Sequence, residues 1–147
     1  MAKEAFIEVN CSRCYGKVFE VIKLLNELGW KYYGNEQKVE YLPLGDDDNF
    51  GWQKEYLEAE TIEMIINSKQ DNDEQIGLIL YYNNAEGITM LARNTDKLVF
   101  NININRKTIN NKKNGLTDIG WYFKNIIFAL QEKGCIIDRI SFEEYEG

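Results

Sequence analysis

Cys11 and Cys14 lie in a Cys-x-x-Cys spacing within the stretch VNCSRCYGKV, and this spacing is the first candidate for chemistry in the chain. The stretch is found where an alternating, strand-like run ends and a helical pattern begins. Backbone NH groups at the start of a helix stabilise a thiolate and thereby lower the pKa of a cysteine. Spacing and position are therefore those of a thiol redox centre.

The remaining sequence argues against redox or metal chemistry at this pair. A thioredoxin-like site also uses a proline that enters a later strand, whereas the only proline, Pro43, lies between an early strand and an acidic loop. A structural zinc site needs four Cys or His ligands, and the chain adds only Cys135 and no histidine. We expect structural cysteines, at least one free thiol and a reducing compartment, because three unevenly spaced cysteines do not suit a secreted disulfide framework.

The second candidate is the acidic and aromatic stretch DDDNFGWQKEYLE, residues 46–58. It does not fit a calcium loop. Counted from Asp46, the fifth position is Phe50 and the twelfth is Leu57, where the metal needs oxygen ligands. A solvated acidic loop is the plainest interpretation of such a charge run.

Aromatic residues among the carboxylates favour a protein-binding role for this stretch. Carboxylates accelerate the encounter with a cationic protein surface, and aromatic side chains supply the buried contacts. A core role for Trp52, holding the following helix against the sheet, remains equally open. The predicted contact residues are Asp46, Asp47, Asp48, Phe50, Trp52, Glu55, Tyr56 and Glu58.

Composition excludes several classes of function. The net charge of −7 repels nucleic acid and anionic membranes, so we expect neither as a partner. The absence of histidine removes the commonest general base and the commonest neutral metal ligand. The chain also lacks GxGxxG, Walker and GxSxG motifs. We therefore expect a protein that is not an enzyme and uses no cofactor or metal.

Length and hydropathy predict one globular domain over residues 1–147 in the cytoplasm. With 147 residues, 44% of them apolar, the chain can bury a core without disulfides or metals. The N-terminal residues do not form a signal peptide, and no apolar run approaches the roughly 18 residues that span a membrane.

Periodicity predicts an α+β fold, a mixed or antiparallel sheet packed by three helices, in the order β-α-β-β-α-β-β-β-α-β. The runs at 30–33 and 38–42 are expected to form a hairpin, and those at 76–82, 87–93 and 97–104 a meander. Thr117 is the expected N-cap of the third helix. The other expected strands are 5–10 and 135–142, and the helices are 18–28, 54–69 and 117–133.

The C-terminal half resembles the immunity proteins of bacterial polymorphic toxin and contact-dependent growth inhibition systems. The likeness lies in the meander IGLILYYNNAEGITMLARNTDKLVFNININR, followed by LTDIGWYFKNIIFALQEKGCIIDRISFEEY, with its TD..WY helix start and acidic last strand. The resemblance implies a cytosolic protein that binds the C-terminal domain of a cognate toxin and blocks it without chemistry of its own. Many toxins of these systems are nucleases with basic substrate-binding faces, so the resemblance also implies a nuclease as a candidate partner.

Two other functions remain open at this point. One is a thioredoxin-like thiol oxidoreductase that uses Cys11 and Cys14, and the other is a non-catalytic regulatory adaptor. The oligomeric state is not determined by the sequence, and the acidic tail, which contains Glu143, Glu144 and Glu146, is a competing binding patch.

Overall fold

The computed structural model describes residues 3–14, 16–112 and 115–146, whose strands form one antiparallel sheet. The strand order is β4-β3-β5-β6-β7-β1-β8, and β2 pairs with one end of β5. The strands are β1 (Lys3–Arg13), β2 (Trp30–Lys31), β3 (Val39–Tyr41), β4 (Gln53–Glu55), β5 (Ile76–Tyr82), β6 (Glu86–Ala92), β7 (Lys97–Ile104) and β8 (Ile136–Glu146).

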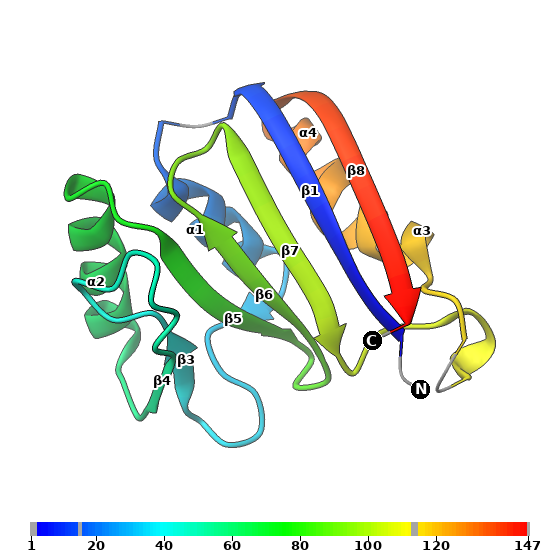
Figure 1. The fold of residues 1–147 in the computed structure, drawn as a ribbon, viewed down its shortest axis with the longest axis horizontal. Coiled ribbons are helices and arrows are strands. Elements are labelled where there is room, and N and C mark those ends of the chain that lie inside the picture. Colours follow the sequence, from blue (N-terminus) through cyan, green and yellow to red (C-terminus); the bar gives the residue numbers. More distant parts are fainter. Residues whose placement is uncertain (1–2, 15, 113–114, 147) are drawn as a thin grey trace.

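Helices cover one face of this sheet and leave the other without a helix (Figure 1). They are α1 (Val18–Glu27), α2 (Ala59–Asp71), the 3-10 turn η1 (Ile109–Asn111), and a continuous helical segment made of α3 (Ile119–Tyr122), the π-helical η2 (Phe123–Ile127) and α4 (Phe128–Glu132). The predicted α+β class and the β5-β6-β7 meander are confirmed. The short strand β4 is an addition to the predicted order.

The core lies between the sheet and the helices. Every second residue of β1 and β7 is buried, as the two-residue period of a strand requires. The helices contribute apolar stripes at three- and four-residue spacing. Core residues from the sheet include Ile7, Val9, Leu80, Met90 and Phe100, and those from the helices include Ile22, Leu25, Ile66, Ile126 and Leu130.

The predicted hairpin is wrong. β2 pairs with Tyr81 and Tyr82, whereas β3 pairs with Leu78 of the same β5 strand and, on its other side, with β4. The buried Trp30 helps to fix β2, because its indole Nε1 donates to the carbonyl of Asn125 at 3.1 Å. The two runs therefore have a neighbour in common and do not pair with each other.

Two predicted helix starts are also corrected. Residues 53–55 pair with β3, so α2 begins at Ala59 and not at Lys54. Asp118, not Thr117, is the N-cap of α3, and its Oδ1 accepts a hydrogen bond from the backbone NH of Trp121 at 3.2 Å. Thr117 instead forms a bridge with Thr108 and binds a carboxylate in β8.

That carboxylate belongs to Glu144 and fastens β8 to the start of α3. It accepts hydrogen bonds from the backbone NH of Thr117 at 2.7 Å, from Thr117 Oγ1 at 2.5 Å and from Arg106 at 3.1 Å. Burial alone would raise the pKa of Glu144, but the Thr117 hydrogen bonds and the Arg106 charge outweigh it and lower the pKa.

A disulfide between Cys14 and Cys135 joins the segment before α1 to the start of β8, across 121 residues of sequence. The cysteine spacing did not predict this bond, whereas the expectation of at least one free thiol is confirmed by Cys11. Sequence spacing singled out Cys11 as the partner of Cys14, but the antiparallel pairing of β1 with β8 brings Cys135 to it. Cys11 is a buried free thiol.

The disulfide predicts a stability that depends on reductant. Opening a bond that closes so long a loop should lower the free energy of unfolding by about 2 to 4 kcal/mol, because the unfolded chain regains entropy. Urea unfolding with and without dithiothreitol measures this loss. A double variant, Cys14→Ser with Cys135→Ser, should be insensitive to the reductant, and an equally insensitive native chain would contradict the bond.

The Glu144 interactions predict a loss of stability in acid. Because its folded pKa is lowered, the carboxylate stabilises the fold fully above the unfolded value near 4.5, and this contribution is lost as pH falls through the folded pKa. Glu144→Gln should therefore be less stable than the native chain at pH 7, with the difference shrinking toward pH 3. Urea unfolding at both pH values measures it, and a difference independent of pH would contradict the assignment.

Candidate protein-binding surface

The helix-free face of the sheet carries apolar side chains across its centre. Cross-strand register places Ile79 beside Thr89, and Leu91 beside Val99, on this face. All four side chains are half-buried, although no described helix covers them. In a sheet with one face in water, the residues on that face are mostly polar. The apolar centre of this face is therefore a candidate contact surface.

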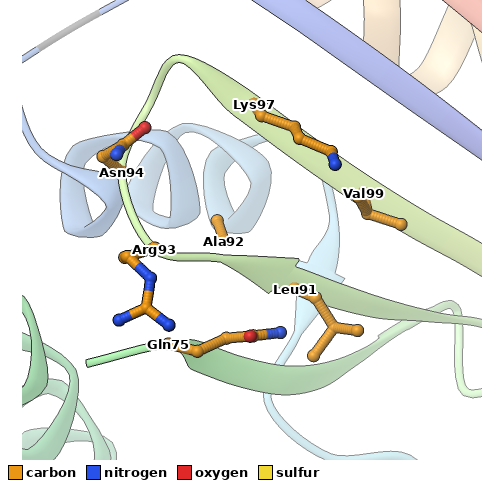
Figure 2. A pocket seen from close by; sticks show the side chains of 7 residues that line it. All are labelled: Gln75, Leu91, Ala92, Arg93, Asn94, Lys97 and Val99. Atoms are coloured by element: carbon orange, nitrogen blue, oxygen red, sulfur yellow. The ribbon is translucent and has the colours of Figure 1, made fainter. Parts of the chain in front are cut away.

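Two hollows lie on this face and meet at Leu91. The larger, of about 570 Å³, lies between the strands and the segment that follows β3. The smaller, of about 310 Å³, lies at the β6-β7 end of the sheet, where the Leu91 and Val99 side chains stand on adjacent strands (Figure 2). The larger hollow is lined by Glu40, Phe50, Trp52, Ile79, Thr89, Leu91 and Asn101.

A buried lysine positions the segment that borders the larger hollow. Lys69 of α2 is 1% exposed, and its ammonium donates to the carbonyls of Pro43 at 2.8 Å and Asp46 at 2.7 Å. The third acceptor is the Glu74 carboxylate at 3.2 Å, which also accepts from the backbone NH of Gly45 at 2.8 Å. All three protons of the ammonium are thus used, as a buried charge requires.

Asp46 shapes the next turn and is not free to meet a partner. Its carboxylate accepts hydrogen bonds from the backbone NH groups of Asn49 at 3.0 Å, Phe50 at 3.2 Å and Gly51 at 2.7 Å. The residue is only 8% exposed. The prediction that Asp46 steers a partner is therefore corrected, because its charge is spent on holding the loop.

The Asp46 turn brings two aromatic side chains to the larger hollow. Phe50 adopts a φ of 53°, an unusual value for a bulky residue, and is 48% exposed. Trp52 is 36% exposed and lies over Gly77, where an added Cβ would approach its ring to 2.9 Å. Glycine at position 77 therefore permits the indole to lie against the sheet. Trp52 does not staple α2 to the sheet but borders the open face.

The other predicted acids have different surroundings. Asp47 pairs with Arg93 at 2.6 Å and accepts from the backbone NH of Gln75 at 2.8 Å, which ties the segment to β6. The Arg93 hydrogen bond, the largest influence, lowers the pKa of Asp47. Asp48 is exposed and makes no hydrogen bond or ion pair with a described residue. In Figure 2 the Arg93 side chain points toward Gln75, whose amide extends toward Leu91.

The last three predicted contact residues lie away from the larger hollow. Glu55 accepts a hydrogen bond from the Tyr41 hydroxyl. Tyr56, 72% exposed, and Glu58 border a separate hollow of about 230 Å³. The structure therefore keeps Phe50 and Trp52 on one surface and separates Tyr56 and Glu58 from them.

The residues missed by sequence reasoning are Lys69 and the apolar row Ile79, Leu91 and Val99. The sequence did contain a signal for this row, because these positions are apolar in strands whose alternate residues already supply the core. Lys69 had none, because a lysine near the end of a helix is normally an exposed residue.

The cysteines do not form a redox pair. Cys14 is bonded to Cys135, and burial, followed by the charges of Asp138 and Asp96, raises the pKa of Cys11. A reactive cysteine needs a lowered pKa and an accessible sulfur. Within residues 3–14, 16–112 and 115–146, no three His, Cys, Asp or Glu side chains gather as metal ligands would.

Comparisons with family models, with curated proteins and with solved structures found no match to this chain. None of the described helices is both long enough and apolar enough to span a membrane.

The Lys69 interactions predict a selective loss of stability. Lys69→Met should lower the free energy of unfolding by about 3 kcal/mol, because the Pro43 and Asp46 carbonyls and the Glu74 carboxylate lose their hydrogen bonds to the buried ammonium. Lys23→Met removes an ion pair with Glu63 from a more exposed site and should lower it by less than about 1 kcal/mol.

Urea unfolding measures both variants, and hydrogen exchange locates the effect. Exchange of the Phe50 and Gly51 amides should accelerate in Lys69→Met and stay unchanged in Lys23→Met. Equal losses in the two variants, with no change at these amides, would contradict the role given to Lys69.

Proposed function

We propose that this protein is a stoichiometric inhibitor of the immunity class, which binds a cognate toxin domain and blocks it without catalysing a reaction. The observation that carries the proposal is the hollow, apolar sheet face bordered by Phe50 and Trp52. An exposed apolar centre with aromatic side chains at its margin is the usual composition of a protein-binding hot spot.

The charge of the protein supports a cationic partner. The net charge of −7 produces a long-range attraction for a basic protein surface, such as the substrate-binding face of a nuclease toxin. Asp48, an exposed residue of the segment between β3 and β4, is available to pair with a lysine or arginine of the partner. The remaining carboxylates of residues 46–58 act through the total charge or serve the loop.

The surface is held in place before the partner arrives. Lys69, Asp46 and the Asp47–Arg93 pair each fix one part of the segment between β3 and β4. A fixed surface loses little conformational entropy on association, and this favours the tight binding that an inhibitor needs.

The cytoplasm is the proposed compartment, because an immunity protein of this class guards its own cell there. In a reducing cytoplasm Cys14 and Cys135 would be thiols, whereas an oxidising compartment would preserve their disulfide. Trapping free thiols with an alkylating reagent at cell lysis, followed by mass spectrometry, distinguishes the two.

The binding test uses the C-terminal domain of a toxin encoded beside this gene, as a catalytically inactive variant. Calorimetry should show one toxin domain bound per chain, and the native chain should protect cells that express the active toxin. Trp52→Ala should weaken binding at least about thirtyfold, because truncating a tryptophan that forms a binding hot spot typically removes 2 kcal/mol or more.

Tyr56→Ala is the matched control, since it removes a more exposed aromatic side chain from the same segment but from the other hollow. It should change the dissociation constant less than threefold, and thermal unfolding verifies that both variants fold. No binding by the native chain would refute the function. Weaker binding by Tyr56→Ala alone would move the interface to residues 56–58.

A further inference from the structure

β8 is a long edge strand with an unpaired outer side. It extends for 11 residues and pairs with β1 alone, and no backbone group of the described residues pairs with its other edge. An edge of this length is a template for a further strand. Proteins protect such edges by shortness, by a cover, by charged side chains or by bulges. β8 is long and uncovered, and its charges and its register shift at Asp138 restrict it to a partner strand of complementary sequence.

The helical segment α3-η2-α4 runs the length of β8 and exposes apolar side chains. One end is fixed by the Thr117 hydrogen bonds to Glu144, and the other leads through Cys135 directly into Ile136. Two exposed apolar residues lie at each end, Leu116 and Ile119 at the first, and Phe128 and Ile136 at the second. The edge therefore has two apolar ends.

We propose that β8 pairs with β8 of a second copy of this chain, antiparallel, with Ser141 on the two-fold axis. Antiparallel pairing places the end of one copy that carries Phe128 and Ile136 next to the end of the other copy that carries Leu116 and Ile119. The two-fold symmetry forms this contact twice. It joins the two sheets into one continuous sheet and covers all four exposed apolar residues in each copy.

The sequence of β8 is complementary to itself in this register. Arg139 of one copy stands opposite Glu143 of the other, and both side chains lie on the helix-free face, as their pairing with Asn10 and Phe6 of β1 shows. Ile140 stands opposite Phe142 on the helix-covered face. Arg139 is exposed and forms no ion pair with a described residue of its own chain, so it is available for this contact.

Neighbouring registers, in which paired residues also lie on the same face of the sheet, lose this complementarity. An axis at Ile140 places Arg139 opposite Ser141, and an axis at Arg139 places two arginines together. The Ser141 axis does oppose Asp138 and Glu144, but Arg106 and Thr117 already pair with Glu144 within its own chain. Charge therefore selects one register.

The dimer leaves the candidate protein-binding surface free. The larger hollow is formed by β3, β5, β6 and β7 with the segment after β3, and β1 separates these strands from β8. A two-fold axis perpendicular to the sheet would present both hollows on the same side of the dimer, so that each copy keeps its own binding face.

The first test is the mass of the full chain in solution, by multi-angle light scattering over a concentration series. The native chain should have twice the 17.2 kDa of one copy at high concentration. Arg139→Glu should raise the dimer dissociation constant at least about tenfold, because two attractions become two repulsions. The double variant Arg139→Glu with Glu143→Arg should restore it to within about threefold of the native value. Lys17→Glu, an equal charge reversal on the segment before α1, should leave it unchanged.

Two further measurements identify the edge. Phe128→Ser should weaken the dimer while its thermal unfolding remains cooperative, since Phe128 is half exposed. Hydrogen exchange should show those β8 amides that point away from β1 protected at high concentration and exchanging freely on dilution. A monomer at every concentration overturns the proposal. So does a dimer that Arg139→Glu leaves intact and in which those amides stay unprotected, because it would use another surface.

Discussion

The burial of one ammonium group determines the shape of the candidate binding surface. Lys69 gives up its hydration, which is tolerable only because two carbonyls and one carboxylate replace the lost water. The Pro43 and Asp46 carbonyls belong to the segment between β3 and β4, and the Glu74 carboxylate lies between α2 and β5, so α2 and the segment after β3 must close together. Without the ammonium, the Pro43 carbonyl would keep, among the described residues, only the backbone NH of Asp46 as a donor, and the segment would lose its direct hydrogen bonds to α2.

Other features of the surface depend on this closure. Once Asp46 is fixed through its carbonyl, its carboxylate can gather three successive backbone amides and force the turn that carries Phe50. The turn then delivers Trp52 onto Gly77, where any side chain would collide with the indole. A glycine in a central strand normally weakens a sheet, and here its position is explained by the close approach of the Leu42 side chain, at 2.6 Å from an added Cβ, and of the Trp52 ring, at 2.9 Å.

The fold was largely predictable because its signals are local and repeated. The meander and the three helices each repeat a period of two or of 3.6 residues over several turns or strands, as Leu98, Phe100 and Ile102 illustrate. The hairpin at residues 30–42 was misjudged because both runs pair with β5, and pairing with a distant strand has no local signature. Cys14 was misjudged for the same reason. Its partner Cys135 is distant in sequence, and only the antiparallel pairing of the first and last strands brings the two together.

The candidate site was predictable in part, and the division has a physical basis. Phe50 and Trp52 could be predicted as contact residues, because a loop that only meets water does not need aromatic side chains among its carboxylates. The role of Asp46 could not be predicted, because a carboxylate that steers a partner and one that caps a turn are identical in sequence. What separates them is burial, which depends on Lys69 from another element. Under the proposed function, a surface whose carboxylates are engaged within the loop would attract a partner through the net charge of the whole protein and would discriminate between partners by shape. Specificity for one partner should therefore reside in the fit of Phe50, Trp52 and the apolar row, with the acids contributing mainly to the rate of encounter.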